Sequence, residues 1–249
     1  MLTRRQFIRL CATSIATAGI SGAQLLTSGY ASPHIPVLLY HRVGYSTNYL
    51  TVTPDRLDAD LKYLANRGYQ AISLKQFERF MLDQAVQLPE KPVLITFDDG
   101  YYDNYQNAFP VLARYGMSAA FFVITGMLWE PDRMAPRHIQ EMLQAGMSFG
   151  SHTVSHRSLG ELTVEEMRAE LDDSKTTLES VLGQSVTFVA YPKGSYNQTT
   201  VRIAEELKYT GGFTVINGRC SKEMPDFALR RIPVFGFDKE LSRVLAERG

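Results

Sequence analysis

Two histidines and a pair of adjacent aspartates are the side chains whose types and spacing best suit metal chemistry. His152 and His156 are four residues apart, and this spacing places two imidazoles on the same side of one helical turn. Asp98 and Asp99 follow an apolar run and precede a glycine. Adjacent carboxylates repel each other, so at a buried strand end they need a cation or a shared proton. For Asp-Asp-Gly alone, a turn whose Asp side chains accept from backbone N–H groups is the structural alternative.

The two histidines and one of the aspartates would together form a three-ligand set that leaves a metal position open for water. Such a set is typical of hydrolytic zinc sites, whereas structural zinc sites are closed by four protein ligands. The other aspartate would then be free to act as a base. Because two nitrogens and one oxygen also suit Co²⁺, Ni²⁺ or Fe²⁺, the expected cofactor is one divalent ion, with Zn²⁺ as the first choice.

These residues follow short apolar runs that alternate with helical patterns along the chain. The predicted strands are at 37–40, 92–97, 119–124, 147–150, 187–191, 213–216 and 232–235. The predicted helices are at 54–67, 103–115, 136–145, 163–182 and 199–209. Such alternation indicates an α/β fold in which parallel strands are covered by helices. About seven strands predict a single-domain, distorted (β/α)7 barrel, closed or incomplete, and a doubly wound open sheet is the structural alternative.

The polar candidates sit where different predicted strands end. His41, Asp98, His152 and the Pro-Lys-Gly-Ser-Tyr string at 192–196 each follow a different apolar run. In barrels of this kind the carboxyl ends of the strands carry the chemistry. Four strand ends that converge on one rim favour an active site more strongly than any single motif does.

Two strings resemble a known family. Thr-Phe-Asp-Asp-Gly at 96–100 and His-Thr-Val-Ser-His at 152–156 resemble the first two motifs of the polysaccharide deacetylases, the NodB-homology family. The resemblance spans residues 35–236, and it implies a distorted barrel that removes N- or O-acetyl groups from glycans with a divalent metal. It implies Asp98 as the catalytic base. The metal ligands that it implies are Asp99, His152 and His156.

Three motifs of the family are altered or missing. One of them, Asp-x-x-Asp-Trp, is absent, and the only tryptophan is Trp129. The third motif usually begins with Arg, but here Ala190 begins the string Ala-Tyr-Pro-Lys-Gly. Arg230 and Arg231 precede the last predicted strand, and one of them is a candidate to orient Asp98 instead; a solvated pair is the alternative. The usual C-terminal Leu-x-His is absent, since no histidine follows His156.

The N-terminal predicted strand offers a replacement for the missing acid. Leu-Leu-Tyr-His-Arg-Val at 38–43 and Tyr-Pro-Lys-Gly-Ser-Tyr at 191–196 resemble the branch that deacetylates poly-β-1,6-N-acetylglucosamine. In that branch the histidine of the N-terminal strand is thought to supply the acid, which implies this role for His41; a packed structural histidine is the alternative. The backbone N–H of Lys193 is expected to help hold the oxyanion.

The expected function is metal-dependent removal of N-acetyl groups from an exported, poly-N-acetylglucosamine-like polysaccharide, with release of acetate. An O-acetyl esterase or a peptidoglycan deacetylase would use the same site. A non-catalytic glycan-binding module is the alternative of a different class: the missing third-motif arginine favours it, and the presence of Asp98 and His41 opposes it. A polysaccharide is the expected partner, and the sequence predicts no particular protein partner.

Residues 1–31 are interpreted as a twin-arginine-type signal peptide and residues 32–249 as the catalytic domain. An Arg-Arg-x-Phe-Ile string at 4–8 precedes a stretch without Lys, Arg, Asp or Glu at 10–31. Small residues indicate cleavage after Ala31, and an uncleaved anchor helix is the alternative. The signal predicts a periplasmic or extracellular location.

Composition and charge exclude several other classes. The 249 residues are 45% hydrophobic and 21% charged, which argues against disorder. Basic and acidic residues number 26 each, and three of the basic residues are arginines of the leader. Without the leader the chain has a small negative net charge, so electrostatics does not favour nucleic acid or an anionic membrane as partner. After the leader, no apolar run reaches the roughly 18 residues of a membrane-spanning helix. Of the two cysteines, only Cys220 lies outside the leader, so an internal disulfide of the mature chain is excluded.

Overall fold

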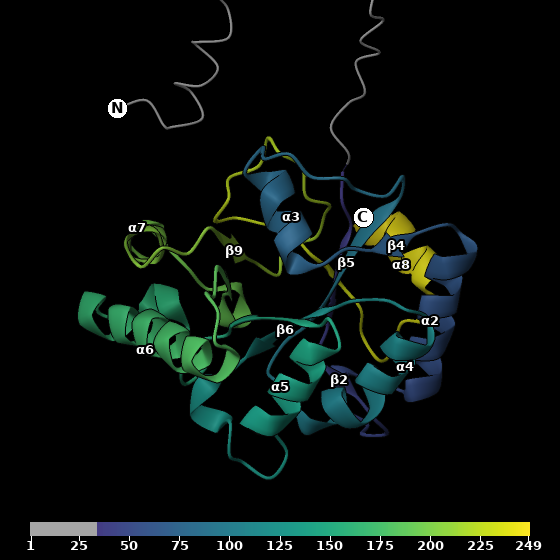
Figure 1. The fold of residues 1–249 in the computed structure, drawn as a ribbon, viewed down its shortest axis with the longest axis horizontal. Coiled ribbons are helices and arrows are strands. Elements are labelled where there is room, and N and C mark those ends of the chain that lie inside the picture. Colours follow the sequence, from purple (N-terminus) through teal and green to yellow (C-terminus); the bar gives the residue numbers. More distant parts are fainter. Residues whose placement is uncertain (1–33) are drawn as a thin grey trace, which may run out of the picture. The chain divides into compact units, whose positions relative to one another are not determined.

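The computed structural model describes residues 34–249 and builds them around one parallel sheet (Figure 1). Its strands run in the order β10-β1-β5-β6-β7-β8-β9, and every neighbouring pair is parallel. Their bounds are β1 Val37–Tyr40, β5 Pro92–Phe97, β6 Ala120–Val123, β7 Ser148–Ser151, β8 Phe188–Ala190, β9 Gly211–Phe213 and β10 Ile232–Pro233. The predicted signal peptide, residues 1–31, lies outside the described residues, so the division of the chain there stays a prediction.

Helices are arranged around the strands, as Figure 1 shows. Their bounds are α2 Pro54–Asn66, α3 Leu74–Met81, α4 Phe109–Arg114, α5 Pro136–Gln144, α6 Val164–Leu182, α7 Gln198–Glu206 and α8 Leu241–Arg248. The remaining strands are β2 Arg42–Val43, β3 Thr51–Val52 and β4 Gln70–Ala71; β2 pairs with β3, and β4 extends the sheet at the start of β5. Within residues 34–249, none of the helices has the length and apolarity needed to cross a membrane.

Alternate residues of each strand face opposite sides of the sheet, and this divides the apolar core in two. On β5, Ile95 and Phe97 pack in the cluster beneath the helices, whereas Leu94 belongs to the cluster inside the barrel. Thr96 also faces the interior, where its hydroxyl accepts from a buried arginine. The same alternation brings Asp98, the first residue after β5, to the interior. The period of the strand therefore decides which way this carboxylate points.

Helix α3 packs across the interior of the barrel at the amino ends of the strands. The backbone N–H of Leu74 donates to the hydroxyl of Ser148, the first residue of β7, at 3.4 Å. The ring of Phe77 lies 6.0 Å from that of Phe188 and 5.6 Å from that of Phe213. Aromatic side chains fill this end of the barrel, so open space for a ligand lies at the carboxyl ends of the strands.

Residues 229–233 join the two ends of the sheet. Leu229 forms a parallel bridge with Phe213 of β9, and the two residues of β10 pair with β1. Arg231 lies between these contacts, and its side chain is fully buried inside the barrel. The predicted distorted barrel is thereby confirmed, and the doubly wound open sheet is excluded.

Two predicted elements differ from the observed ones. The strand predicted at 213–216 is wrong in position, because β9 is Gly211–Phe213. Only glycine fits there, since a Cβ on Gly212 would lie 2.1 Å from the hydroxyl of Tyr191. The helix predicted at 103–115 begins as a π-helix, Asn104–Ala108, and becomes α-helical only in α4. Pro110 has no N–H for the regular i→i−4 bond, and this explains the change of bonding.

Helix α3 is absent from the sequence-based prediction, although its start carries a recognisable signal. Ser73 and Gln76 form a reciprocal capping box at its amino terminus. By contrast, the helix predicted at 163–182 is observed as α6: it begins after a capping box of Thr163 and Glu166, and it ends at Gly183 in the left-handed conformation. The start and end that the sequence predicts for α6 are therefore both confirmed.

Gly126 fixes the distance between the loop after β6 and the histidine-bearing loop after β7. Its N–H donates to the carbonyl of Val154 at 2.9 Å, and a Cβ at this position would lie 2.6 Å from that oxygen. We expect Gly126→Ala to lower the free energy of unfolding by about 1–3 kcal/mol, because two backbone segments must separate. Urea unfolding of the purified protein measures this change.

Gly44→Ala is the matched control, because its Cβ would meet only a carboxylate oxygen of Asp103 at 3.9 Å, an ordinary contact. Equal unfolding free energies for the two variants would contradict the close approach of the two loops.

Candidate active site

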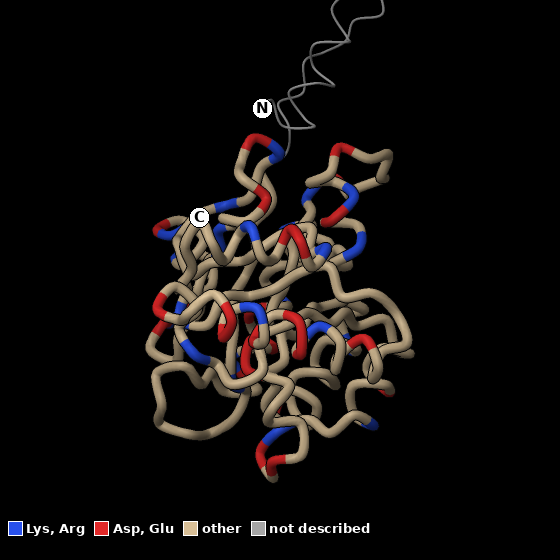
Figure 2. The backbone as a smooth tube through the Cα atoms, turned by 90° about the vertical axis from the view of Figure 1, so that its left-hand side faces the viewer, with Lys and Arg blue, Asp and Glu red and all other residues tan. Residues whose placement is uncertain are grey.

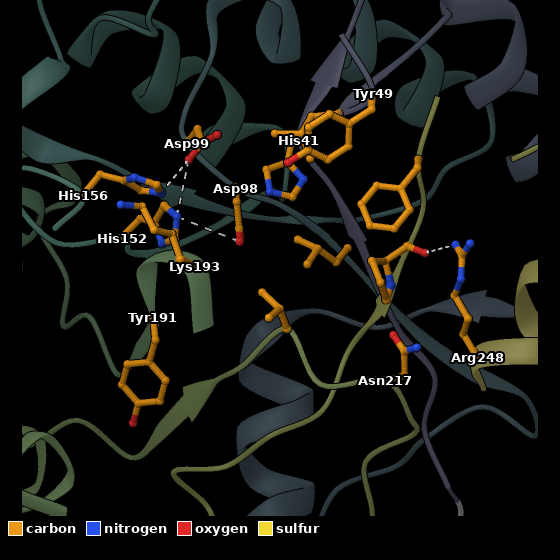
Figure 3. Close-up of a pocket in the computed structure, with 15 residues that line it drawn as sticks. His41, Tyr49, Asp98, Asp99, His152, His156, Tyr191, Lys193, Asn217 and Arg248 are labelled. Atoms are coloured by element: carbon orange, nitrogen blue, oxygen red, sulfur yellow. Dashed lines mark hydrogen bonds and ion pairs between the residues drawn. The ribbon is translucent and has the colours of Figure 1, made fainter. Parts of the chain in front are cut away.

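Asp99, His152 and His156 converge at the carboxyl ends of β5 and β7. The Oδ1 atom of Asp99 lies 3.4 Å from Nε2 of His152 and 3.4 Å from Nε2 of His156 (Figure 3). One ligand atom from each residue lies within 4.8 Å of the other two. This Oδ1 atom is buried and has no hydrogen-bond partner. Three ligand atoms this close together, one of them a buried oxygen without a hydrogen-bond partner, fit a divalent cation.

The ionisation of these residues also suits a cation. Burial opposes the charge on Asp99, but the neighbouring His152 outweighs it and holds the pKa of this carboxyl below its usual range. Burial, and then the nearby His152, lower the pKa of His156 to about 4, so its ring is neutral near pH 7. Burial also opposes the charge on His152, but the carboxylates of Asp98 and Asp99 outweigh it and raise its pKa in the absence of a metal.

The local structure around the two histidines differs from the prediction. They do not share a helical turn; they lie in a loop after β7, in which Thr153 and His156 have positive φ angles of 65° and 60°. The Nδ1–H of His152 donates to the carbonyl of Ala190 at 2.7 Å. This bond fixes the tautomer that leaves Nε2 free to face Asp99.

Glu170 of helix α6 holds the backbone of this loop. The N–H groups of Val154 and Ser155 both donate to its Oε2 atom at 2.9 Å, and the hydroxyl of Ser155 donates to Oε1. Glu170 is buried, and burial of a carboxylate without hydrogen bonds would destabilise the fold, so these bonds offset that cost. The sequence analysis missed this residue, which carries no local motif.

Asp98 forms a bidentate ion pair with Arg231 inside the barrel. Nη1 and Nη2 of the guanidinium each donate to one carboxylate oxygen at 2.7 Å. The same arginine donates from Nε to the carbonyl of Thr214 at 2.9 Å, and its side chain is 0% exposed. Burial opposes the charge on Asp98, but Arg231 outweighs it and lowers the pKa of this carboxyl. The carboxylate is therefore ionised at neutral pH.

The structure separates the two arginines that the sequence left as alternatives. Arg230 is exposed, and its backbone carbonyl accepts from the thiol of Cys220. Both carboxylate oxygens of Asp98 are engaged by Arg231. The position usually filled from the third motif is thus filled from the segment that joins the ends of the sheet.

His41 follows β1 and faces the two aspartates across the cavity (Figure 3). Its Nδ1 atom is buried without a hydrogen-bond partner. Burial lowers the pKa of this imidazole, while the carboxylates of Asp98 and Asp99 act in the opposite direction. An unpartnered ring nitrogen beside two carboxylates is available for a substrate.

These side chains line one cavity of about 570 Å³. Lys193 reaches it from the turn after β8, where its φ angle is 57°. The cavity is therefore lined by every predicted site residue except the two arginines, and one of these two, Arg231, contacts Asp98 from inside the barrel. The other residues that line the cavity are Leu39, Tyr49, Leu50, Tyr191, Val215, Asn217, Pro233, Phe235 and Arg248.

A stack of three side chains supports the backbone of Asp99, and the sequence analysis missed it. Asp99 has a φ angle of 73°, unusual for a residue with a Cβ. Nη1 of Arg133 donates to its carbonyl at 2.9 Å. The guanidiniums of Arg133 and Arg42 lie on the ring of Tyr101, 3.9 and 4.2 Å from its centroid. The stack connects the residue after His41 to the metal-ligand candidate.

We expect the wild-type protein to bind one divalent ion, such as Zn²⁺, per chain. His156→Gln should weaken this binding by more than roughly 100-fold, because even the outer partners of a metal ligand are worth about 10–100-fold in affinity. Competition with a chromophoric chelator measures the affinity. His34→Gln is the matched control, since His34 is an exposed histidine outside the cavity. Equal affinities for the two variants would remove His156 from the ligand set.

Comparison with known proteins shows where the chain belongs. The sequence profile of the family described as polysaccharide deacetylase matches residues 85–212. The YxkH protein of Bacillus subtilis (strain 168), which carries the name of a polysaccharide deacetylase, is 39% identical over 200 residues; the match covers 80% of this chain and 71% of that protein.

A second relative and a solved structure agree with this result. The poly-β-1,6-N-acetyl-D-glucosamine N-deacetylase of Staphylococcus aureus (strain MRSA252) is 25% identical over 196 residues, covering 73% of this chain and 67% of that protein. The structure of Streptococcus pyogenes deacetylase PplD in complex with acetate superposes with a TM-score of 0.82 at 31% identity, over 88% of this chain and 100% of that one. The profile and the relatives confirm what the two motifs predict: the chain belongs to the polysaccharide deacetylase family of metal-dependent hydrolases.

Proposed function

We propose that this enzyme removes N-acetyl groups from an exported amino-sugar polysaccharide similar to poly-N-acetylglucosamine and releases acetate. The observation that carries the proposal is the Asp98–Arg231 ion pair, which keeps an ionised carboxylate in the cavity of the candidate ligands. This pair opposes the alternative of a non-catalytic glycan-binding module, because the arginine absent from the third motif has a replacement. The name of the Staphylococcus aureus relative supports the amino-sugar substrate, and the acetate in the Streptococcus pyogenes structure supports the product.

The candidate metal ligands and Asp98 would act in the first step of the reaction, the attack of water on the acetyl carbonyl. A divalent ion held by Asp99, His152 and His156 would polarise the acetyl carbonyl and lower the pKa of water, and we propose that this ion is zinc. Asp98 would accept the proton of the attacking water, because Arg231 keeps it ionised and fixes its orientation. The N–H of Lys193 would donate to the oxyanion, a contact whose loss typically costs about 2.7–4 kcal/mol.

His41 would complete the reaction by protonating the departing amine. An amine leaves poorly as an anion, so a donor on its side of the cavity is required, and such donors are typically worth about 10²–10⁴-fold in rate. Burial lowers the pKa of His41 and opposes the imidazolium form, while the carboxylates of Asp98 and Asp99 act in favour of it. The products would be acetate and a glycan with a free amine.

The setting of the reaction is part of the proposal. The twin-arginine-type signal at residues 1–31 would direct a folded, metal-loaded protein to the periplasm or the extracellular space. An O-acetyl esterase and a peptidoglycan deacetylase are the alternatives that the same cavity would accommodate. The N-deacetylase of a poly-N-acetylglucosamine-like polymer is preferred because the Staphylococcus aureus relative is named for that activity.

We expect the purified enzyme to release acetate from β-1,6-linked N-acetylglucosamine oligomers, and a chelator should abolish the release. Asp98→Asn should reduce the rate by about 10²–10⁴-fold while metal content persists, because only the proton acceptor is removed. Enzymatic detection of acetate on β-1,6- and β-1,4-linked oligomers measures the rates of the wild type, with and without chelator, and of Asp98→Asn. Elemental analysis of the purified variant measures its metal content.

Three other outcomes would each replace the proposal. Release from O-acetylated substrates alone would indicate an esterase. Release from peptidoglycan alone would indicate a peptidoglycan deacetylase. Glycan binding without release from any substrate would indicate a binding module.

A further inference from the structure

Three neighbouring aromatic rings, two of which line the cavity, are not used by the proposed chemistry. Tyr49, from the loop between β2 and β3, lies 5.9 Å from Phe235, and Phe235 lies 5.2 Å from Phe237 in a stacked arrangement. Tyr49 is 60% and Phe237 64% exposed, whereas Phe235 is half-buried. We call these three residues the aromatic row. Contiguous exposed apolar groups of this kind often mark a binding surface.

The aromatic row is held in place by hydrogen bonds on both sides. The N–H of Phe235 donates to Asp238 at 2.8 Å, and Arg248 forms a bidentate ion pair with the same carboxylate at 2.6 and 2.8 Å. The guanidinium of Arg248 lies 5.2 Å from the centre of the Phe235 ring. The N–H of Gly236 donates to the carbonyl of Tyr49 at 2.8 Å. The backbone segments that carry Tyr49 and Phe235 are thus held together, and Arg248 packs on the Phe235 ring.

The aromatic row is continuous with the catalytic groups. Tyr49 and Phe235 line the same cavity as His41 and Asp98, and Figure 3 shows Tyr49 beside His41 at the cavity wall. Phe237 lies beyond Phe235 and extends the row out of the cavity. One acetylated sugar at the candidate metal site would leave Phe237 uncovered. A chain of sugars leaving the site would pass over it.

We infer that the aromatic row stacks on the sugar rings that adjoin the acetylated residue in the same glycan chain, so that the enzyme selects polymers over single sugars. This inference rests on the proposed function. The C–H faces of pyranose rings are apolar and pack on aromatic faces, while the hydroxyls at the ring edge stay in water. Rigid rings bind without a large loss of side-chain entropy, which favours affinity.

A lipid surface is the other ligand that exposed rings could contact, and the surrounding charges do not favour it. Arg248, the arginine that lines the cavity, is paired with the carboxylate of Asp238. In the view of Figure 2, Lys/Arg and Asp/Glu positions are interspersed along the backbone, and such mixing of signs does not favour anionic headgroups.

The test compares Phe237→Ala and Tyr49→Ala with Trp129→Ala, a matched control whose ring is 80% exposed on the loop after β6, outside this cavity. We expect the ratio of kcat/KM on a β-1,6-linked N-acetylglucosamine tetramer to that on the monosaccharide to fall roughly tenfold in each of the two variants, mainly through KM. Trp129→Ala should keep the wild-type ratio.

A second measurement, tetramer binding by isothermal titration calorimetry, separates this inference from the proposed function. Suppose that neither the wild type nor any variant releases acetate, but that Phe237→Ala and Tyr49→Ala bind the tetramer more weakly than the wild type and Trp129→Ala do. The proposed function is then contradicted, whereas the inferred role of the aromatic row in glycan binding is supported. Wild-type activity with an unchanged ratio in the two variants overturns the aromatic row alone. Loss of binding to anionic phospholipid vesicles, with tetramer binding unchanged, also overturns it and assigns the rings to a membrane.

Discussion

The buried ion pair between Asp98 and Arg231 is the interaction on which the site depends. Both side chains lie in the barrel interior, where an unpaired charge would cost about 3–5 kcal/mol. The arginine can reach the carboxylate only because residues 229–233 join β9 to β1 and bury Arg231 at that join. Closure of the barrel therefore places the guanidinium that lowers the pKa of the candidate base.

The two adjacent aspartates serve different partners because the backbone turns between them. Asp98 continues the inward alternation of β5 and faces Arg231, whereas the positive φ of Asp99 turns its carboxylate toward the histidine pair. Arg133 holds the strained residue by its carbonyl, and Glu170 holds the loop of the histidines. The residues that follow strand β5 thus include both a candidate base and a candidate metal ligand, and each is fixed by a side chain distant in sequence.

The sequence predicted the features that are local and left open those that depend on closure. Apolar runs between Pro, Gly and Asp gave the bounds of β1 and β5, and the two motifs predicted the residues that meet around Asp99. The histidine pair meets through a loop with two left-handed residues, which spacing alone cannot distinguish from a helical turn. Neighbours in the chain, Arg230 and Arg231, differ only in which side of the joining segment they occupy, so tertiary structure alone decides between them. Arg133 and Glu170 act over more than ten residues and carry no local signal.

The most direct test of this account is a double-mutant cycle in kcat/KM for acetate release, made with Asp98→Asn, Arg231→Met and both together at matched folded fraction. If Arg231 acts through Asp98, each single change lowers kcat/KM by about 10²–10⁴-fold, and the double variant is no worse than Asp98→Asn. Arg230→Met should match the wild type, because its side chain is exposed. Losses that multiply in the double variant, or an Arg231→Met enzyme with wild-type kcat/KM, would contradict the account.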